Sequence, residues 1–133
     1  MSKKSWGIIV IAAIGLVLLG YNLMPAPEPE IQQITNDELE ERLKNSNADD
    51  VIFVDVREEE EFNSGHINGM KNMPLSTLHE TYAQLPKDKE IVLICRSGSR
   101  SMQAANLLKE NGYERLVNVE GGMINWHGPV VSQ

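Results

Sequence analysis

Two short runs of aliphatic and β-branched residues constrain the fold of this chain more than any other feature. They are Val51-Ile52-Phe53-Val54 and Ile91-Val92-Leu93-Ile94. Each run has the length of a strand and no polar residue at alternate positions, which is typical of strands that are covered on both faces. Such strands occur in parallel sheets that carry helices on both sides, so the sequence predicts an α/β domain.

Strand and helix patterns alternate along the rest of the chain at short intervals. Further strands are expected at residues 31–34, 70–74 and 117–119. Helices are expected from the cap sequence Thr35-Asn36-Asp37-Glu38 onward, in the acidic segment that ends near 63–65, at 76–85, at 99–111 and around 124–126. The expected fold class is therefore a three-layer α/β domain with a mainly parallel sheet flanked by helices. Ligands of such domains bind where strands end and helices begin.

The N-terminal segment does not follow this alternation. Residues 7–20 are uncharged and almost wholly apolar. We expect one transmembrane helix that anchors the chain within residues 1–24, followed by a spacer rich in proline and glutamate at 25–30 and by the domain at 31–133. The alternative is a signal peptide that is cleaved and leaves a secreted domain, although no A-x-A-like site follows the apolar run.

Charge placement predicts the orientation of this anchor and excludes one class of partner. Lys3 and Lys4 precede the apolar run, and the first charges after it are Glu28 and Glu30. The N-terminus is therefore expected in the cytoplasm and the domain on the outer side of the membrane. Without the two lysines at the start, 10 basic and 19 acidic residues remain, a balance of −9. A domain this acidic is not expected to bind nucleic acid, and only the N-terminal helix is expected to contact the membrane.

Cys95 is the only cysteine, and it follows the second apolar run directly. The loop Cys95-Arg96-Ser97-Gly98-Ser99-Arg100 then leads into the strongest helical pattern. Backbone N–H groups in a compact loop at a helix N-terminus form a cradle for an anion, and Arg96 and Arg100 add positive charge. The thiol is therefore expected to have a lowered pKa and to be reactive. The other interpretation is a small buried hydrophobe, but two arginines and two serines so close behind it are poor choices for packing alone.

The loop from Cys95 to Arg100, followed by Ser101, resembles the active-site loop of single-domain rhodaneses. Other landmarks of that family occur in the same order, namely Asp55-Val56-Arg57, Gly65-His66-Ile67, Asn72-Met73-Pro74, and Gly121-Gly122-Met123 followed by Trp126. The resemblance extends over residues 31–127, which is nearly all of the expected domain.

The resemblance implies a rhodanese-type sulfurtransferase. In such an enzyme the cysteine takes sulfur from a small anionic donor such as thiosulfate, becomes a persulfide, and passes the sulfur to cyanide or a thiol. Carried onto this sequence, Cys95 is the catalytic residue. The residues expected to bind the substrate are Arg96, Ser97, Gly98, Ser99 and Arg100. Asp55 and Arg57 are expected to form a structural pair at a strand end, with support of the active loop as their functional role, and neither a cofactor nor a metal is expected.

Two other functions are compatible with the same residues. Phosphatases on a related fold also have a cysteine loop that ends in arginine, but that loop has one more residue than the four that separate Cys95 from Arg100 here. The shorter loop favours sulfur over a tetrahedral phosphate, so a phosphatase or arsenate reductase is the weaker alternative. The stronger alternative is a rhodanese-fold module at the membrane that is not an enzyme and serves as a sulfur carrier, thiol sensor or docking domain.

Overall fold

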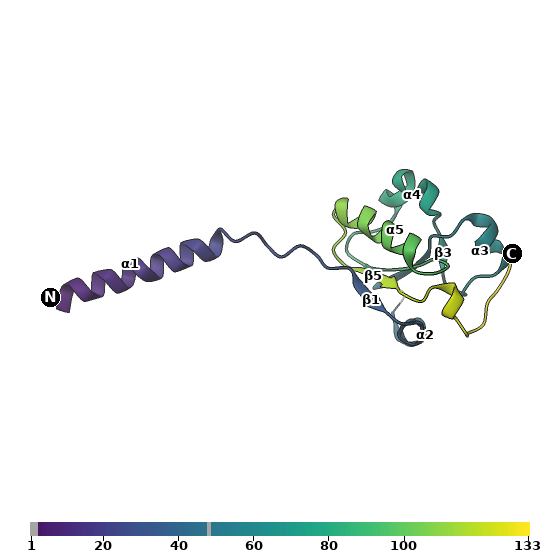
Figure 1. Cartoon of the computed structure of the whole chain (residues 1–133), viewed down its shortest axis with the longest axis horizontal. Coiled ribbons are helices and arrows are strands. Elements are labelled where there is room, and N and C mark those ends of the chain that lie inside the picture. Colours follow the sequence, from purple (N-terminus) through teal and green to yellow (C-terminus); the bar gives the residue numbers. More distant parts are fainter. Residues whose placement is uncertain (1–2, 48) are drawn as a thin grey trace.

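The N-terminal helix extends away from an α/β domain in this computed structural model, which describes residues 3–47 and 49–133 (Figure 1). This helix, α1, spans Lys3–Asn22. Its apolar run, residues 7–20, lies between Trp6 and Tyr21 and extends about 21 Å along the axis. In the part of the chain that the structure describes, no helix is long and apolar enough to cross a membrane. The expected transmembrane anchor is therefore not supported.

A five-stranded sheet forms the centre of the domain, and every pair of neighbouring strands in it is parallel. In spatial order the strands are β1 (Gln32–Ile34), β5 (Leu116–Val119), β4 (Glu90–Ile94), β2 (Val51–Asp55) and β3 (Lys71–Asn72). The two apolar runs of the sequence thus form neighbouring strands in the interior of the sheet, as their composition predicts.

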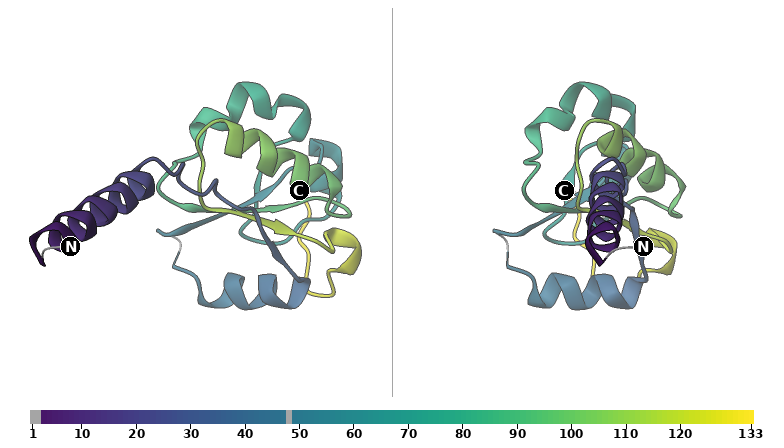
Figure 2. Two further views of the ribbon diagram at one scale, coloured as in Figure 1. Left: turned by 60° about the vertical axis from the view of Figure 1, so that its left-hand side comes forward. Right: turned by 90° about the vertical axis from the view of Figure 1, so that its left-hand side faces the viewer.

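Helices cover both faces of this sheet (Figure 2). On one face lie α4 (Leu75–Thr81), which continues as the 3-10 turn η1 (Tyr82–Gln84), and α5 (Ser99–Glu110). On the opposite face lies α2 (Asn36–Asn45). A short acidic helix, α3 (Glu59–Ser64), and a second 3-10 turn, η2 (Met123–Asn125), follow the carboxyl ends of β2 and β5. The three-layer α/β architecture expected from the sequence is confirmed.

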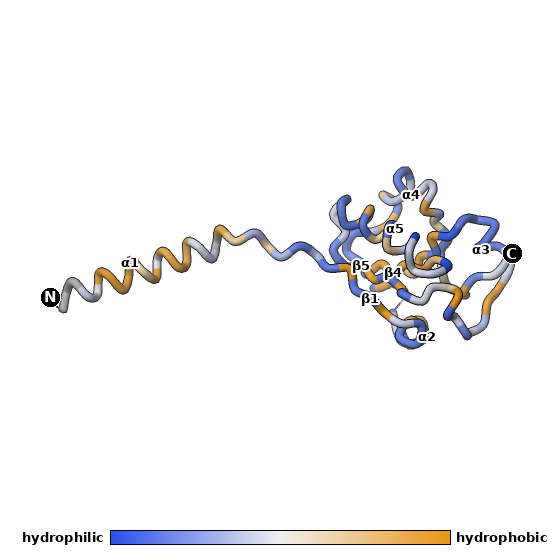
Figure 3. The backbone as a smooth tube through the Cα atoms, viewed as in Figure 1, coloured by the Kyte–Doolittle hydropathy of each residue, from blue (hydrophilic) through white to orange (hydrophobic). Residues whose placement is uncertain are grey.

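Hydropathy along the backbone reflects this layering, with apolar residues in α1 and the sheet and hydrophilic residues in α3 (Figure 3). Within β4 and the residue after it, successive side chains alternate between two hydrophobic cores. Ile91, Leu93 and Cys95 belong to the core that also contains residues of α4 and α5. Val92 and Ile94 belong to the core that contains residues of α2. Because strand side chains alternate in this way, Cys95 emerges on the same face of the sheet as α5.

Most of the expected elements are present with small changes of their bounds. The cap before α2 is confirmed, since the Glu38 N–H donates to the Thr35 hydroxyl at 3.3 Å and the Thr35 N–H donates to the Glu38 carboxylate at 2.7 Å. The strand expected at residues 70–74 is only Lys71–Asn72, because Pro74 has no N–H and lies at the start of α4. The short C-terminal helix is a single 3-10 turn.

Candidate active site

Gly98 determines the shape of the loop between β4 and α5. It is the N-cap of α5 and has φ +93°, a left-handed conformation that glycine adopts at little cost. A Cβ atom at this position would lie 2.4 Å from the carbonyl oxygen of Glu120, so no larger residue fits without moving the backbone. This turn directs the Gly98 N–H back to the Sγ of Cys95, at 3.1 Å.

Cys95 is buried, with 1% of its surface exposed, and its Sγ accepts a second hydrogen bond from the Ser101 hydroxyl at 3.3 Å. Burial raises the pKa of the thiol, but the hydrogen bonds from the Ser101 hydroxyl and from the backbone N–H groups of Ser101, Ser97 and Gly98 outweigh burial. The pKa of Cys95 is therefore below its ordinary value. The loop favours the thiolate, which is the nucleophilic form of cysteine.

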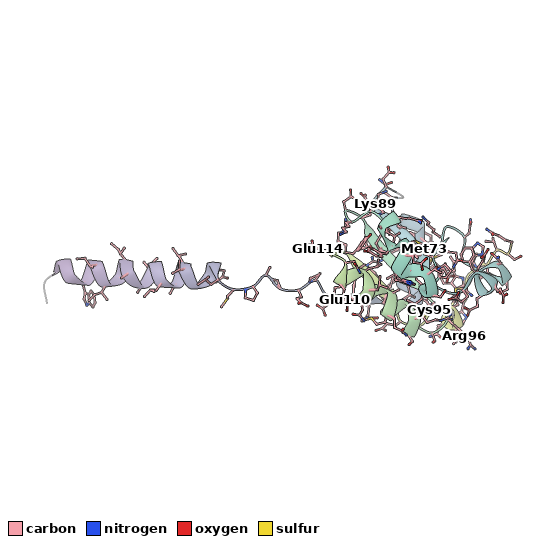
Figure 4. The ribbon with its side chains drawn as sticks, turned by 90° about the horizontal axis from the view of Figure 1, so that it is seen from above. Met73, Lys89, Cys95, Arg96, Glu110 and Glu114 are labelled. Carbon is pink, nitrogen blue, oxygen red and sulfur yellow. The ribbon has the colours of Figure 1, made fainter. Side chains whose placement is uncertain are left out.

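The two arginines of the loop have different surroundings. Arg100 donates two hydrogen bonds to Glu61 of α3, from Nη1 at 2.7 Å and from Nη2 at 2.8 Å. Arg96 is exposed, and among the residues that the structure describes its guanidinium has no hydrogen-bond or ion-pair partner. In Figure 4, Arg96 lies toward the edge of the domain, and Cys95 lies closer to its middle. Of the two charges expected to attract a substrate, the one on Arg96 is therefore the more available.

The Glu61–Arg100 pair connects α3 to the first turn of α5. The hydrogen bonds from Arg100 lower the pKa of the Glu61 carboxyl to about 2, against the smaller opposing effect of burial. Pairing with Glu61 likewise raises the pKa of Arg100, and negative charge on Cys95 contributes to the same shift to a smaller extent. Arg100 therefore stabilises the position of the loop while a large part of its charge is compensated.

Ser97 and Ser99 complete the set of residues expected to bind the substrate. Both have exposed side chains, so their hydroxyl groups face solvent. The backbone N–H of Ser97 contributes to the lowered pKa of Cys95. The structure thus places the backbone of the loop around the sulfur and leaves the polar side chains of the two serines on the outside.

Asp55 and Arg57 form the expected pair at the carboxyl end of β2. Arg57 Nη2 donates to Asp55 Oδ2 at 2.7 Å, and the two side chains are 9% and 0% exposed. The same Nη2 donates to the carbonyl oxygen of Gly65 at 2.8 Å. The N–H of Val56 donates to the carbonyl oxygen of Ile94, at 2.9 Å, and Ile94 immediately precedes the catalytic candidate. The buried pair therefore stiffens the segment that lies beside the start of the loop.

Sequence reasoning did not assign a role to the turn after β5. Gly122 has φ +59°, and a Cβ atom there would lie 2.5 Å from the carbonyl oxygen of Arg96 and 2.7 Å from that of Cys95. The N–H groups of Met123 and Ile124 donate to the carbonyl oxygens of Cys95 and Arg96, at 2.9 and 3.0 Å. This turn therefore fixes the carbonyl groups of Cys95 and Arg96, because each accepts a backbone hydrogen bond from it. The Gly121-Gly122 pair marks a turn in the sequence, but its contact with the loop is visible only in the structure.

Sequence reasoning also left Ser101 and Glu61 out of the site. Ser101 directly follows the recognised loop, is buried, and donates its hydroxyl hydrogen to the Sγ of Cys95. Glu61 lies in an acidic run that is typical of a solvated helix, and its partner Arg100 lies 39 positions further along the chain. No local pattern distinguishes it from its neighbours in that run.

Comparison with known proteins agrees with the geometry. A profile of the rhodanese-like domain matches residues 35–129. The chain belongs to the rhodanese-like domain family. A sulfurtransferase of Allochromatium vinosum is 36% identical to this rhodanese-like chain over 105 residues, which is 77% of this chain and 96% of that protein. The thiosulfate sulfurtransferase GlpE of Shewanella oneidensis is 35% identical over 80 residues, 60% of this chain and 79% of that protein.

Solved structures give the same result for the fold. A crystal structure of a rhodanese-like domain protein from Staphylococcus aureus superimposes with a TM-score of 0.70 at 34% sequence identity. The match covers 77% of this chain and 99% of that one. The family resemblance and the fold expected from the sequence are confirmed.

Proposed function

We propose that this rhodanese-like protein is a sulfurtransferase that moves sulfane sulfur from an anionic donor such as thiosulfate to cyanide or a thiol, through a persulfide on Cys95. The observation that carries the proposal is that a buried sulfur accepts hydrogen bonds from the Gly98 N–H and the Ser101 hydroxyl. A neutral packed thiol needs no such donors, whereas a sulfur anion is stabilised by them. The relatives named as sulfurtransferases support the same function.

Loading of the sulfur begins with the thiolate of Cys95. It attacks the outer sulfur of thiosulfate, a new S–S bond forms to Sγ, the S–S bond of thiosulfate breaks, and sulfite leaves with the bonding electron pair. The negative charge of the thiolate is then carried by the terminal sulfur of the persulfide. The N–H groups of the loop therefore stabilise an anion both before and after the transfer.

Arg96 provides the attraction for the donor in this proposal. Its guanidinium is exposed next to the reactive residue, and no carboxylate within the described ranges neutralises it. A doubly charged anion is attracted to such a cation more strongly than a neutral sulfur compound is. Arg100, bound to Glu61, orients the loop instead.

In the second half of the reaction, the acceptor attacks the persulfide on Cys95. A cyanide ion or an acceptor thiolate attacks the outer sulfur of the persulfide, the S–S bond breaks, and its electron pair returns to Sγ. Thiocyanate or a new persulfide leaves, and Gly98 and Ser101 again hold the Cys95 thiolate. The overall reaction transfers a sulfur atom without net oxidation, so these residues require no redox cofactor.

Intact-protein mass spectrometry tests the proposal directly. The protein treated with thiosulfate is expected to gain one sulfur atom, and cyanide is expected to remove that atom again. The Cys95→Ser variant is expected to keep its fold by circular dichroism and to gain nothing. The proposal is wrong if the native protein gains no sulfur, or if the serine variant transfers sulfur at the same rate.

Two further measurements separate the alternative functions. Stoichiometric loading followed by very slow transfer to cyanide and thiols would favour a sulfur carrier over an enzyme. Hydrolysis of a chromogenic phosphate ester, measured on the same sample, would favour a phosphatase; the proposal expects none above the level of the Cys95→Ser variant.

A further inference from the structure

Asn118 is a buried polar residue at a position where the strand pattern calls for an apolar one. It lies on β5, opposite Leu93 of β4, and is only 4% exposed. Its neighbours Val117 and Val119 belong to the core on the α2 side. Leu116, two residues before it, belongs to the core on the α5 side. Because side chains alternate along a strand, Asn118 lies on the α5 side, the same side as Cys95.

The amide of Asn118 is only partly satisfied. Its Nδ2 donates to Gln33 Oε1 at 2.8 Å and, more weakly, to the carbonyl oxygen of Gly98 at 3.4 Å. Both partners are acceptors, so the NH₂ group must face them. Its Oδ1 is buried and has no hydrogen-bond partner in the ranges 3–47 and 49–133. An unpaired buried acceptor destabilises the folded state, and a leucine here would avoid that cost. Stability of the core therefore does not explain the asparagine.

The contact with Gly98 suggests what the residue does. The Gly98 carbonyl accepts from the Asn118 amide and from the Met102 N–H, the latter at 3.2 Å, while the Gly98 N–H donates to Sγ. Glycine has no side chain to limit rotation about φ and ψ, so the backbone of the loop can rotate most easily at Gly98. A hydrogen bond from Asn118, on the sheet, to the Gly98 carbonyl restricts this rotation and thereby the direction of the Gly98 N–H.

We infer that Asn118 is a positioning residue for sulfur transfer, which holds Gly98 so that its N–H stays directed at the Cys95 sulfur. The inference rests on the proposed function for its relevance to turnover, but the geometry concerns the thiolate itself. Asn118 does not touch the sulfur; it acts through Gly98.

The test compares Asn118→Leu with the native protein in two independent measurements. The first is the thermal midpoint of unfolding. The second is the rate of Cys95 alkylation by iodoacetamide as a function of pH, which reports the pKa of the thiol without requiring any sulfur transfer. Removing the amide is expected to leave the midpoint unchanged or higher. It is expected to raise the pKa of Cys95 by about half a pH unit, the effect that one modest hydrogen bond supports.

A matched control is available in Asn111, a half-buried asparagine whose Nδ2 donates to the Leu107 carbonyl at 2.8 Å, at the far end of α5. Asn111→Leu is expected to lower the unfolding midpoint and leave the alkylation profile unchanged, which is the opposite combination. Asn118→Asp provides a second variant of nearly the same shape. It places an acceptor against the Gly98 carbonyl and a negative charge below the loop, so its Cys95 pKa is expected to rise further than in Asn118→Leu.

An alkylation profile of Asn118→Leu that matches the native one overturns the inference, whether or not the native protein forms a persulfide. If Asn118→Leu does not fold, an unchanged profile in Asn118→Asp has the same consequence. Failure of the native protein to take sulfur from thiosulfate overturns the proposed function instead. The alkylation profile still decides whether Asn118 affects the pKa of Cys95.

Discussion

Replacement of Glu61 by glutamine removes the carboxylate that holds Arg100, and its effect on stability should depend on pH in a defined way. The pair contains two hydrogen bonds in the favourable bidentate arrangement. The pKa of Glu61 is lowered from 4.5 to about 2 in the folded protein. Its ionised form is thus preferred in the folded state, and the pair stabilises the fold at neutral pH.

The size of this effect follows from the two pKa values and from exposure. A difference of about 2.5 pH units corresponds to roughly 3 kcal/mol, which is an upper bound. The Glu61 side chain is 35% exposed and that of Arg100 is 32% exposed, so solvent screens the interaction. We therefore expect Glu61→Gln to lower the free energy of unfolding by about 1 kcal/mol at pH 7.

The sign of the pH dependence is fixed by the direction of the pKa shift. A carboxyl group with a lowered pKa in the folded state contributes fully above pH 4.5, and the contribution is lost as the pH falls toward 2. At pH 3.5 at least about two-fifths of the contribution of Glu61 to stability should be lost, and more if its pKa in the folded state is less depressed. The difference between the native protein and Glu61→Gln should therefore shrink between pH 5 and pH 3.5.

Urea unfolding of the protein at pH 7, 5 and 3.5 measures this difference. Glu60→Gln is the matched control, since Glu60 is exposed on the same helix and the substitution is expected to change stability by less than about 0.5 kcal/mol at every pH. A loss in Glu61→Gln that is equal at pH 7 and pH 3.5, or no larger than that of Glu60→Gln, would refute the reasoning.

Three other predictions rest on the geometry of the domain, and a fourth rests on the charges around α1. Gly122→Ala should destabilise the fold by more than about 2 kcal/mol in thermal unfolding, because its Cβ would meet the carbonyls of the loop, whereas Gly69→Ala, also at positive φ but in open space, should cost less. Arg57→Met should cost roughly 3–5 kcal/mol in urea unfolding, because it leaves a buried charge unpaired, and adding Asp55→Asn should recover part of that loss. Arg96→Ala should raise the KM for thiosulfate with little change in the unfolding midpoint, and an unaltered KM in steady-state kinetics would contradict its role in binding the donor. Export of the domain stays a prediction from the charges around α1, and complete protection from protease in intact cells stripped of their outer envelope would oppose it.

The layered fold was predictable because buried strands and helices have hydropathy patterns that can be recognised within a short stretch of sequence. β2 and β4 lie inside the sheet, and each contains four consecutive apolar residues, while α5 begins where the pattern changes to a helical period. The loop between β4 and α5 was recognisable because Cys95, Gly98 and Arg100 lie within six residues. The extent of α1 was less predictable, since a charge-free stretch continues beyond Asn22, where the helix has already ended.

The contacts that define the site were not predictable, because they join residues far apart in the chain. Nothing local in the acidic run of α3 indicates that Glu61, rather than Glu60, reaches Arg100. Likewise, the glycine pair after β5 predicts a turn, but not that Gly122 packs against the carbonyls of the loop. These long-range contacts depend on the order of strands in the sheet, which sequence periodicity does not encode.

The structure also refines the explanation of why the thiolate forms. The sequence predicted a lowered pKa of Cys95 from a cradle of backbone N–H groups, with the charges of Arg96 and Arg100 added to it. In the structure one of these charges is compensated by Glu61, and the groups that favour the anion are the Ser101 hydroxyl and backbone N–H groups. Short-range hydrogen bonds to a buried sulfur are screened little by salt, whereas attraction by the exposed Arg96 is screened strongly. Raising the ionic strength should therefore weaken the capture of an anionic donor while leaving the pKa of the cysteine nearly constant, which separates the two contributions in a single protein without any substitution.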